Sequence, residues 1–131
     1  MKVIHYRIVE DFRSFRKVEI TTEEADDLKV QDGEISLNLT LTNDYDYAVD
    51  FSNVGGRKVY LNAHYLKGLT EVLTIPIEVL TGQMKPGASL EKRVKFSVPE
   101  LPDEYDLRFS VQVEGIEPPI NSMKYPVVVL D

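Results

Sequence analysis

The sequence predicts an all-β fold, a β-sandwich of seven or eight short antiparallel strands. The main observation is the run Tyr105–Glu114, in which five large apolar residues alternate with five polar ones. A period of two places the apolar side chains on one face of a strand and the polar ones on the other. Turn signals recur at short intervals and helical periodicity is nearly absent, which is typical of antiparallel sheets with one buried face.

Seven further segments have the composition of strands: 1–9, 17–21, 35–42, 57–66, 73–80, 90–98 and 123–130. Lys85-Pro86-Gly87 predicts a turn, since Pro presets φ and Gly tolerates positive φ. Pro76, inside the segment 73–80, predicts a sheet edge or a bulge. The long connection 43–56 favours an immunoglobulin-like Greek-key sandwich over the alternative, an up-and-down barrel. In the strand order of an immunoglobulin-like sandwich, the segments 57–66 and 105–114 lie side by side in one sheet.

Composition narrows the functional classes. The 131 residues fit one domain, 1–131, and the chain contains no cysteine, so disulfides, thiol nucleophiles and Cys-based zinc sites are excluded. A net charge of −7 with scattered basic residues argues against nucleic acid. No apolar run has the length of a signal sequence or a membrane span. We therefore expect a cytoplasmic protein with no nucleic-acid or membrane partner.

Residues that carry catalysis are scarce. The two histidines, His5 and His64, are far apart, and there is no Gly-rich phosphate loop or nucleophile elbow. The segment Asn43–Asp50 offers three aspartates as oxygen ligands for calcium, but it lacks the central Gly and closing Glu of an EF-hand. Asn and Asp also favour turns through their own hydrogen bonds. We expect no enzyme, no cofactor and no metal, and interpret this segment as a solvated loop, with a cation site as the alternative.

A candidate binding surface follows from the predicted neighbours. The polar faces of 57–66 and 105–114 would merge into one polar wall, formed by Tyr60, Asn62, His64, Arg108, Ser110 and Gln112. Amides, a guanidinium, a hydroxyl and aromatic rings suit a hydroxylated ligand, although an ordinary water-facing sheet has the same composition. In the loop 43–56, Tyr45 and Tyr47 are candidates for additional contacts through their amphipathic rings. Tyr105 follows a Pro-rich corner, so we interpret it as a structural tyrosine corner.

The order of several motifs is also informative. The motifs are, in order, Leu39-Thr40-Leu41-Thr42-Asn43, Phe51-Ser52-Asn53, 59–66, Met84-Lys85-Pro86-Gly87-Ala88-Ser89-Leu90 and Tyr105-Asp106-Leu107-Arg108-Phe109. Through these motifs the chain resembles the small immunoglobulin-like sandwich found beside bacterial glycosyltransferases and other polysaccharide-assembly enzymes. The resemblance covers about residues 35–130 and implies a non-catalytic accessory role. The chain departs from the pattern in having no tryptophan and in placing Gly115–Pro119 where an aromatic loop is common.

Two main hypotheses follow. The first is a non-catalytic recognition or accessory module, related to glycans, that binds through the polar wall. The second is a protein-interaction or dimerisation module that acts through a sheet edge or face, favoured by the continuous apolar run Val127–Leu130. A third, protease inhibition, depends only on the length of the loop 43–56. The expected partners are thus a glycan, another protein or a second copy of the chain.

Overall fold

The structure is a computed structural model that describes residues 15–24, 28, 30–52, 54–120 and 123–130. The strand predicted over residues 1–9 lies outside this part of the chain. The ten strands of the described residues are β1 (Val18–Thr21), β2 (Val30–Gln31), β3 (Glu34–Asn43), β4 (Val49–Asp50), β5 (Val59–Lys67), β6 (Thr70–Leu80), β7 (Gln83–Met84), β8 (Ser89–Ser97), β9 (Asp103–Val113) and β10 (Tyr125–Val129). The expected all-β class is confirmed for the described residues.

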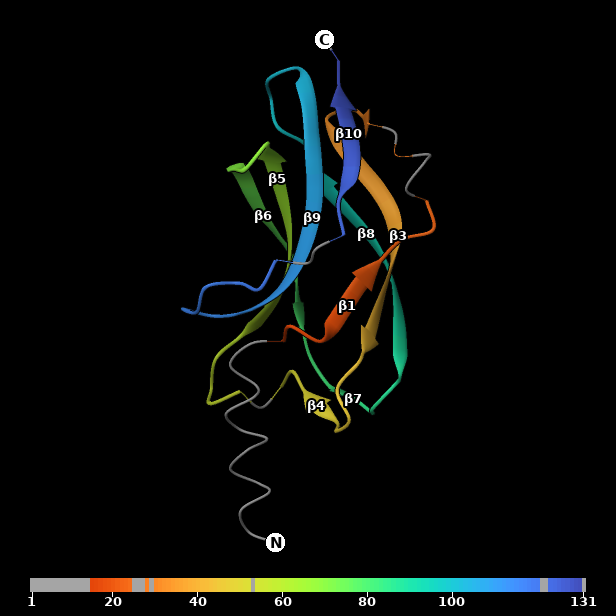
Figure 1. Cartoon of the computed structure of the whole chain (residues 1–131), viewed down its shortest axis with the longest axis vertical. Coiled ribbons are helices and arrows are strands. Elements are labelled where there is room, and N and C mark those ends of the chain that lie inside the picture. Colours follow the sequence, from red (N-terminus) through yellow and green to blue (C-terminus); the bar gives the residue numbers. More distant parts are fainter. Residues whose placement is uncertain (1–14, 25–27, 29, 53, 121–122, 131) are drawn as a thin grey trace, which may run out of the picture.

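The strands form two main antiparallel sheets and one small one. In the first sheet β3 pairs with β1, β2 and β8, and in the second the order is β10-β9-β5-β6. The two main sheets lie against each other as layers (Figure 1). The strand count exceeds the expected seven or eight because β2, β4 and β7, of two residues each, lie in segments that the sequence suggested as connections.

The core lies between the inward faces of the two sheets. The apolar residues of β9 are all buried, as their alternation predicts, and so are Ile35, Leu37, Leu39 and Leu41 on β3. Each such side chain contributes about 1.5–3 kcal/mol by leaving water. Across the core, the Tyr65 hydroxyl donates to the Ser97 carbonyl at 2.8 Å, and burial raises the pKa of this phenol well above its usual value.

Local predictions from proline, glycine and tyrosine hold. The Tyr105 hydroxyl donates to the Leu101 carbonyl at 2.7 Å, which confirms the tyrosine corner. Pro76 lies in β6, an end strand of its sheet, beside a register shift between Leu61 and Asn62. Gly87 has a φ of 74°, in the turn closed by a bond from the Ala88 amide to the Lys85 carbonyl. These local features could be predicted because each depends only on nearby residues.

Asn43 ties two loops together at the end of β3. Its side chain is fully buried, and Nδ2 donates to the carbonyls of Tyr47, Met84 and Lys85 at 3.0–3.2 Å. Its Oδ1 accepts from the Tyr45 amide at 2.9 Å, a local turn bond of the kind that asparagine favours. The loop that follows β3 is therefore anchored to the segment after β7.

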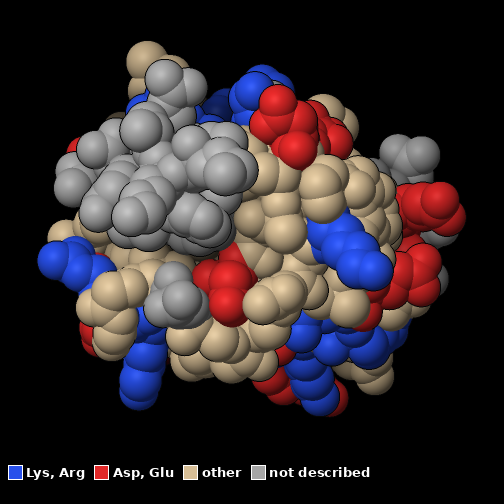
Figure 2. Space-filling model, turned by 90° about the horizontal axis from the view of Figure 1, so that it is seen from below, with Lys and Arg blue, Asp and Glu red and all other residues tan. Residues whose placement is uncertain are grey.

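The end of the sandwich near β4 and β7 has a mixed surface. In Figure 2, Lys and Arg side chains are interspersed with Asp and Glu over the part of this face that is not drawn in grey. An uncharged area lies between them. Neither sign of charge dominates the described part of this end.

Candidate functional site

The predicted polar wall is assembled on the outer face of the second sheet. β5 and β9 pair antiparallel, which confirms that these two segments are neighbours. Tyr60 lies opposite Gln112, Asn62 opposite Ser110, and His64 opposite Arg108. The structure therefore brings all six predicted wall residues together.

The middle of this wall is closed to solvent. His64 is 1% exposed and Ser110 is 0% exposed, and Asn62 is also buried. Tyr60, Arg108 and Gln112, at the margins, are half-buried. The expectation of a water-facing surface, with a surface histidine available for stacking, is wrong for these central residues. A period of two assigns a side chain to a face of the sheet, but it carries no information on what covers that face.

The buried wall residues form a hydrogen-bonded network with two side chains of β6. The Nε2 atom of His64 lies 2.7 Å from the Ser110 hydroxyl, and its Nδ1 lies 2.5 Å from Oε1 of Glu71. Thr74 bonds the same Glu71 oxygen and lies 3.2 Å from Nδ1 of His64. The bonds from Thr74 and then from His64 hold the pKa of the Glu71 carboxyl below its usual value. Glu71 was not among the predicted site residues, because the apolar pattern places the start of this strand at Leu73, whereas β6 begins at Thr70.

A second branch of the network involves the amides. Nδ2 of Asn62 donates to Oε1 of Gln112 at 2.5 Å, and Nε2 of Gln112 donates to the Ile116 carbonyl at 2.9 Å. By contrast, the buried Nε of Arg108 has no hydrogen-bond partner among the described residues. Since buried amides and hydroxyls are stable only when they are hydrogen-bonded, the branches together hold β5, β6 and β9 in register.

The order Glu71–His64–Ser110 matches the connectivity of a hydrolytic triad, in which a carboxylate orients a histidine that activates a serine. A nucleophile must reach its substrate, however, and the Ser110 hydroxyl belongs to a residue with no exposed surface. In this structure the three side chains therefore cross-link strands, and the geometry supports a structural role for them.

Tyr45 and Tyr47 lie elsewhere, in the connection between β3 and β4. Their ring centroids are 5.0 Å apart, and Nζ of Lys17 lies 5.9 Å from the Tyr45 ring centroid. Both rings are half-buried against the core, so they are not gathered with the polar wall. At the end of β4, Oδ1 of Asp50 accepts from the Ser52 amide at 2.9 Å. Among the residues that the structure describes, no group of three or more His, Asp or Glu side chains is placed to hold a metal ion.

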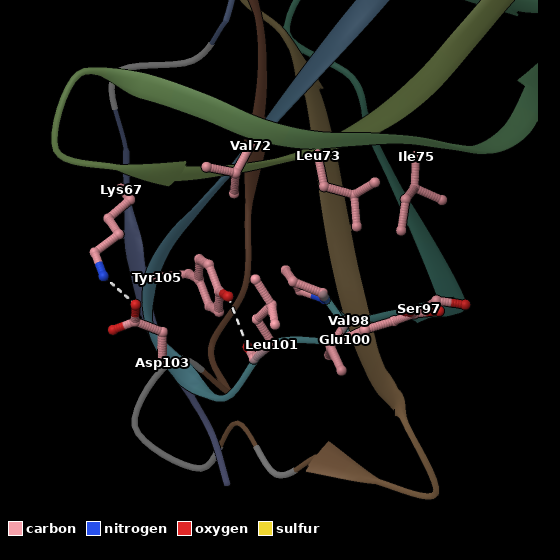
Figure 3. Close-up of a pocket in the computed structure, with 11 residues that line it drawn as sticks. Lys67, Val72, Leu73, Ile75, Ser97, Val98, Glu100, Leu101, Asp103 and Tyr105 are labelled. Atoms are coloured by element: carbon pink, nitrogen blue, oxygen red, sulfur yellow. Dashed lines mark hydrogen bonds and ion pairs between the residues drawn. The ribbon is translucent and has the colours of Figure 1, made fainter. Parts of the chain in front are cut away.

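A cavity of about 660 Å³ lies where β6 faces the connection between β8 and β9. Val72, Leu73 and Ile75 extend from β6 toward Val98 and Leu101 (Figure 3). The remaining lining residues are Lys67, Ser97, Pro99, Glu100, Asp103 and Tyr105. Its walls are therefore mainly apolar, and its charged groups come from residues beside the strand ends.

A β-bulge shapes this cavity. Tyr65 pairs with Leu73 and Leu66 pairs with Glu71, so Val72 is an extra residue in β6. A bulge re-aims side chains locally, and Val72 and Leu73 extend to the same side although they are consecutive (Figure 3). The sequence analysis missed the cavity because strict alternation would place Val72 and Leu73 on opposite faces. The exposed Leu101 between two prolines is the one sequence signal that points to this end.

One ion pair lies at the cavity, and another links β6 to the facing sheet. Lys67 and Asp103 form an ion pair beside the cavity (Figure 3). Their hydrogen bond raises the pKa of Lys67 and lowers that of Asp103. Further along β6, Nζ of Lys92 lies 3.0 Å from Oε2 of Glu78 and joins β8 to β6. Among the charged lining residues, Lys67 and Asp103 are thus paired within the chain, whereas Glu100 has no ion pair among the described residues.

No protein-family model matches the sequence, and no curated protein matches it at significant similarity. Separately, the described residues include no helix that is both long and apolar enough to span a membrane. The function is therefore inferred from the chain's own residues, and the cavity beside β6 is the site that their geometry favours.

Proposed function

We propose that this protein is a non-catalytic recognition module, built on an immunoglobulin-like sandwich, that binds its partner at the cavity beside β6. Two features support the immunoglobulin-like topology: β1-β3-β8 facing β10-β9-β5-β6, and the tyrosine corner of Tyr105 before β9. Ligands often bind such scaffolds at loops and strand ends, which the rigid sheets position.

The cavity is the observation that carries this proposal. Its volume of about 660 Å³ lies within the range of pockets that hold ligands. Leu73 and Ile75 face the core but stay half-exposed, whereas the inward residues of β5 and β9 are buried. Each Å² of apolar surface left in water forgoes about 25 cal/mol of stabilisation. A partner that covers these side chains would gain that free energy.

The glycan version of the proposal has less support. Sugar stacking on the polar wall was expected from Tyr60 and His64, but His64 is buried and bonded on both ring nitrogens, so only the half-buried Tyr60 ring is left for it. The accessory role beside a polysaccharide-assembly enzyme remains a proposal that depends on the motifs of residues 35–130. Such an enzyme would be the protein partner that the module contacts.

The alternative function is interaction through the opposite sheet edge. β10 is the other end strand of its sheet, and Val128 and Leu130 are exposed there. Sedimentation at increasing concentration tests this alternative. A self-association that Val128→Lys abolishes would support it, and a monomer throughout would exclude dimerisation by this edge.

The proposed site is tested with cyclohexanol, a neutral apolar probe, by amide NMR titration of the whole chain. We expect shifts concentrated at the cavity-lining residues, and we expect Ile75→Phe, which places a bulkier ring in the cavity, to weaken them. Val79→Phe is the matched control, because Val79 is exposed on the same strand and does not line the cavity. If Ile75→Phe unfolds, Leu101→Phe at the exposed rim takes its place. Absence of shifts at the lining residues, or equal loss in the control, would contradict the proposal.

A further inference from the structure

We infer that the ligand of this cavity is a segment of a partner protein that inserts a large apolar side chain flanked by lysine or arginine. This inference rests on the proposed function, because it assumes that the cavity beside β6 is the binding site. It adds the chemistry of the partner and the mode of contact.

Exposed apolar side chains extend beyond the cavity over the same end of the sandwich. Leu66 pairs with Asp106, and Asp103 pairs with Val129, so the β5–β6 turn, the start of β9 and the end of β10 lie together. Leu69 in that turn is 100% exposed, and Leu101 is 75% exposed. We call this the cavity end, comprising residues 66–72, 97–106 and 126–130. Its apolar groups lie on three separate segments, which favours a protein partner over a small molecule confined to the cavity.

The charge of the cavity end determines which partner fits. Its one basic residue is Lys67, and its acidic residues are Glu71, Glu100, Asp103, Glu104 and Asp106. Asp103 pairs with Lys67, and Glu71 is bonded to His64 and Thr74. The three carboxylates left without an ion pair among the described residues are those of Glu100, Glu104 and Asp106. By contrast, the end drawn in Figure 2 interleaves both signs of charge. An acidic apolar surface disfavours an anionic membrane and favours a partner that presents cations around an apolar side chain.

The mode of contact follows from the shape of β6. An end strand can accept a partner strand through its free backbone groups, but bulges and proline oppose such pairing. β6 contains Pro76 and two register shifts, one at Val72 and one beside Pro76. Its edge is thus poorly suited to strand addition. Insertion of a side chain between the sheets, without a continuous backbone ladder, is the contact that the structure favours.

The experiment uses two synthetic peptides, acetyl-Gly-Lys-Lys-Trp-Lys-Lys-Gly-amide and its counterpart with Glu in place of Lys. The chain contains no tryptophan, so the fluorescence of the peptide reports on binding without background. We expect the basic peptide to bind at least about tenfold more tightly than the acidic one, with a blue shift of its emission and amide shifts at the cavity lining. Raising the salt concentration should weaken binding of the basic peptide, because salt screens the attraction between its lysines and the carboxylates.

Variants test each part of the contact. Glu100→Lys should weaken binding of the basic peptide and strengthen binding of the acidic one. Leu101→Ser should weaken binding of both peptides. Leu90→Ser is the matched control, because Leu90 is also exposed but pairs with Leu41 at the other end of the sandwich. The inference is overturned if the acidic peptide binds as tightly, or if the shifts avoid the cavity lining. If cyclohexanol binds and neither peptide does, this inference is overturned and the proposed function is left intact. If neither cyclohexanol nor the peptides bind, both the inference and the proposed function are overturned.

Discussion

His64 and Ser110 lie on adjacent strands, with Nε2 of the imidazole 2.7 Å from the serine hydroxyl, and both are buried. The other ring nitrogen is bonded to Glu71 on β6, so one imidazole connects three consecutive strands of the sheet. A polar group in this position stabilises the sheet only while every partner is present, since an unpaired buried group costs free energy.

We therefore expect Ser110→Ala to lower the free energy of unfolding by about 1–2 kcal/mol. His64→Ala should lower it by about 2–4 kcal/mol, because this change leaves both Ser110 and Glu71 without their imidazole partner and creates a void. Denaturant unfolding measures both. Thr42→Ala is the control, since the Thr42 hydroxyl makes a comparable cross-strand bond of 2.9 Å to Ser89 at the surface. Its expected effect is below about 0.5 kcal/mol. Equal effects at the two sites would contradict the structural role of the buried pair.

Glu71 predicts a pH dependence of stability. Thr74, and then His64, lower the pKa of its carboxyl in the folded protein. Such a group stabilises the fold above its unfolded pKa, and this contribution is lost as the pH falls through the folded pKa. The free energy of unfolding should thus decrease between about pH 5 and pH 3, and decrease less in Glu71→Gln.

The measurement is denaturant unfolding across that pH range. Asp103, whose pKa Lys67 also lowers, adds a loss of the same sign in both proteins, so the difference between them isolates Glu71. Glu91→Gln is the control, because Glu91 is exposed on β8 and has no ion pair among the described residues. Parallel curves for the wild type and Glu71→Gln would show that the carboxyl is not linked to folding.

The alternation of β9 was sufficient to predict its buried face, and Tyr105 and Pro76 were sufficient to predict a corner and an irregular edge strand. These features depend on the chemistry of a few consecutive residues. Burial of His64 on the outer face could not be predicted, because it depends on which side chains of β6 and β9 lie beside it, such as Glu71 and Ser110. The cavity could not be predicted either, because an extra residue at Val72 interrupts the alternation that sequence analysis assumes. The buried face of a strand and the position of a corner can thus be predicted from nearby residues. Burial on the outer face and the position of a bulge depend on long-range packing.

Replacing the single side-chain amide of Asn43 should have a large effect on the free energy of unfolding. The buried side chain of Asn43 donates to the carbonyls of Tyr47 in the β3–β4 connection, Met84 at the end of β7, and Lys85 in the turn that follows. Asn43→Ala would leave these acceptors without their donor, and we expect a loss of about 2–4 kcal/mol in the free energy of unfolding. Asn38→Ala, an exposed change on the same strand, should stay within about 0.5 kcal/mol. A small effect of Asn43→Ala would mean that water replaces the amide in this position.

Tyr105 and Tyr125 offer a matched pair for the last prediction. Both face the core and are buried, but the Tyr105 hydroxyl donates to Leu101, whereas the buried Tyr125 hydroxyl has no hydrogen-bond partner among the described residues. Removing a hydroxyl that makes a hydrogen bond lowers stability. Removing a buried hydroxyl that makes none eliminates the free-energy cost of having desolvated it. Tyr105→Phe should therefore lower the free energy of unfolding by about 1 kcal/mol, and Tyr125→Phe should leave it unchanged or raise it by up to about 1 kcal/mol.

Thermal and denaturant unfolding of the two variants decide this prediction, because the changes remove the same atom from the same residue type. Tyr105→Phe should also loosen the connection that carries Leu101, and so weaken binding of cyclohexanol in the adjacent cavity. Tyr125→Phe should leave that binding intact, since Tyr125 does not line the cavity. If both variants lost equal stability, the tyrosine corner would contribute no more than any buried phenol, and the cavity would have to be held in shape by its apolar contacts alone.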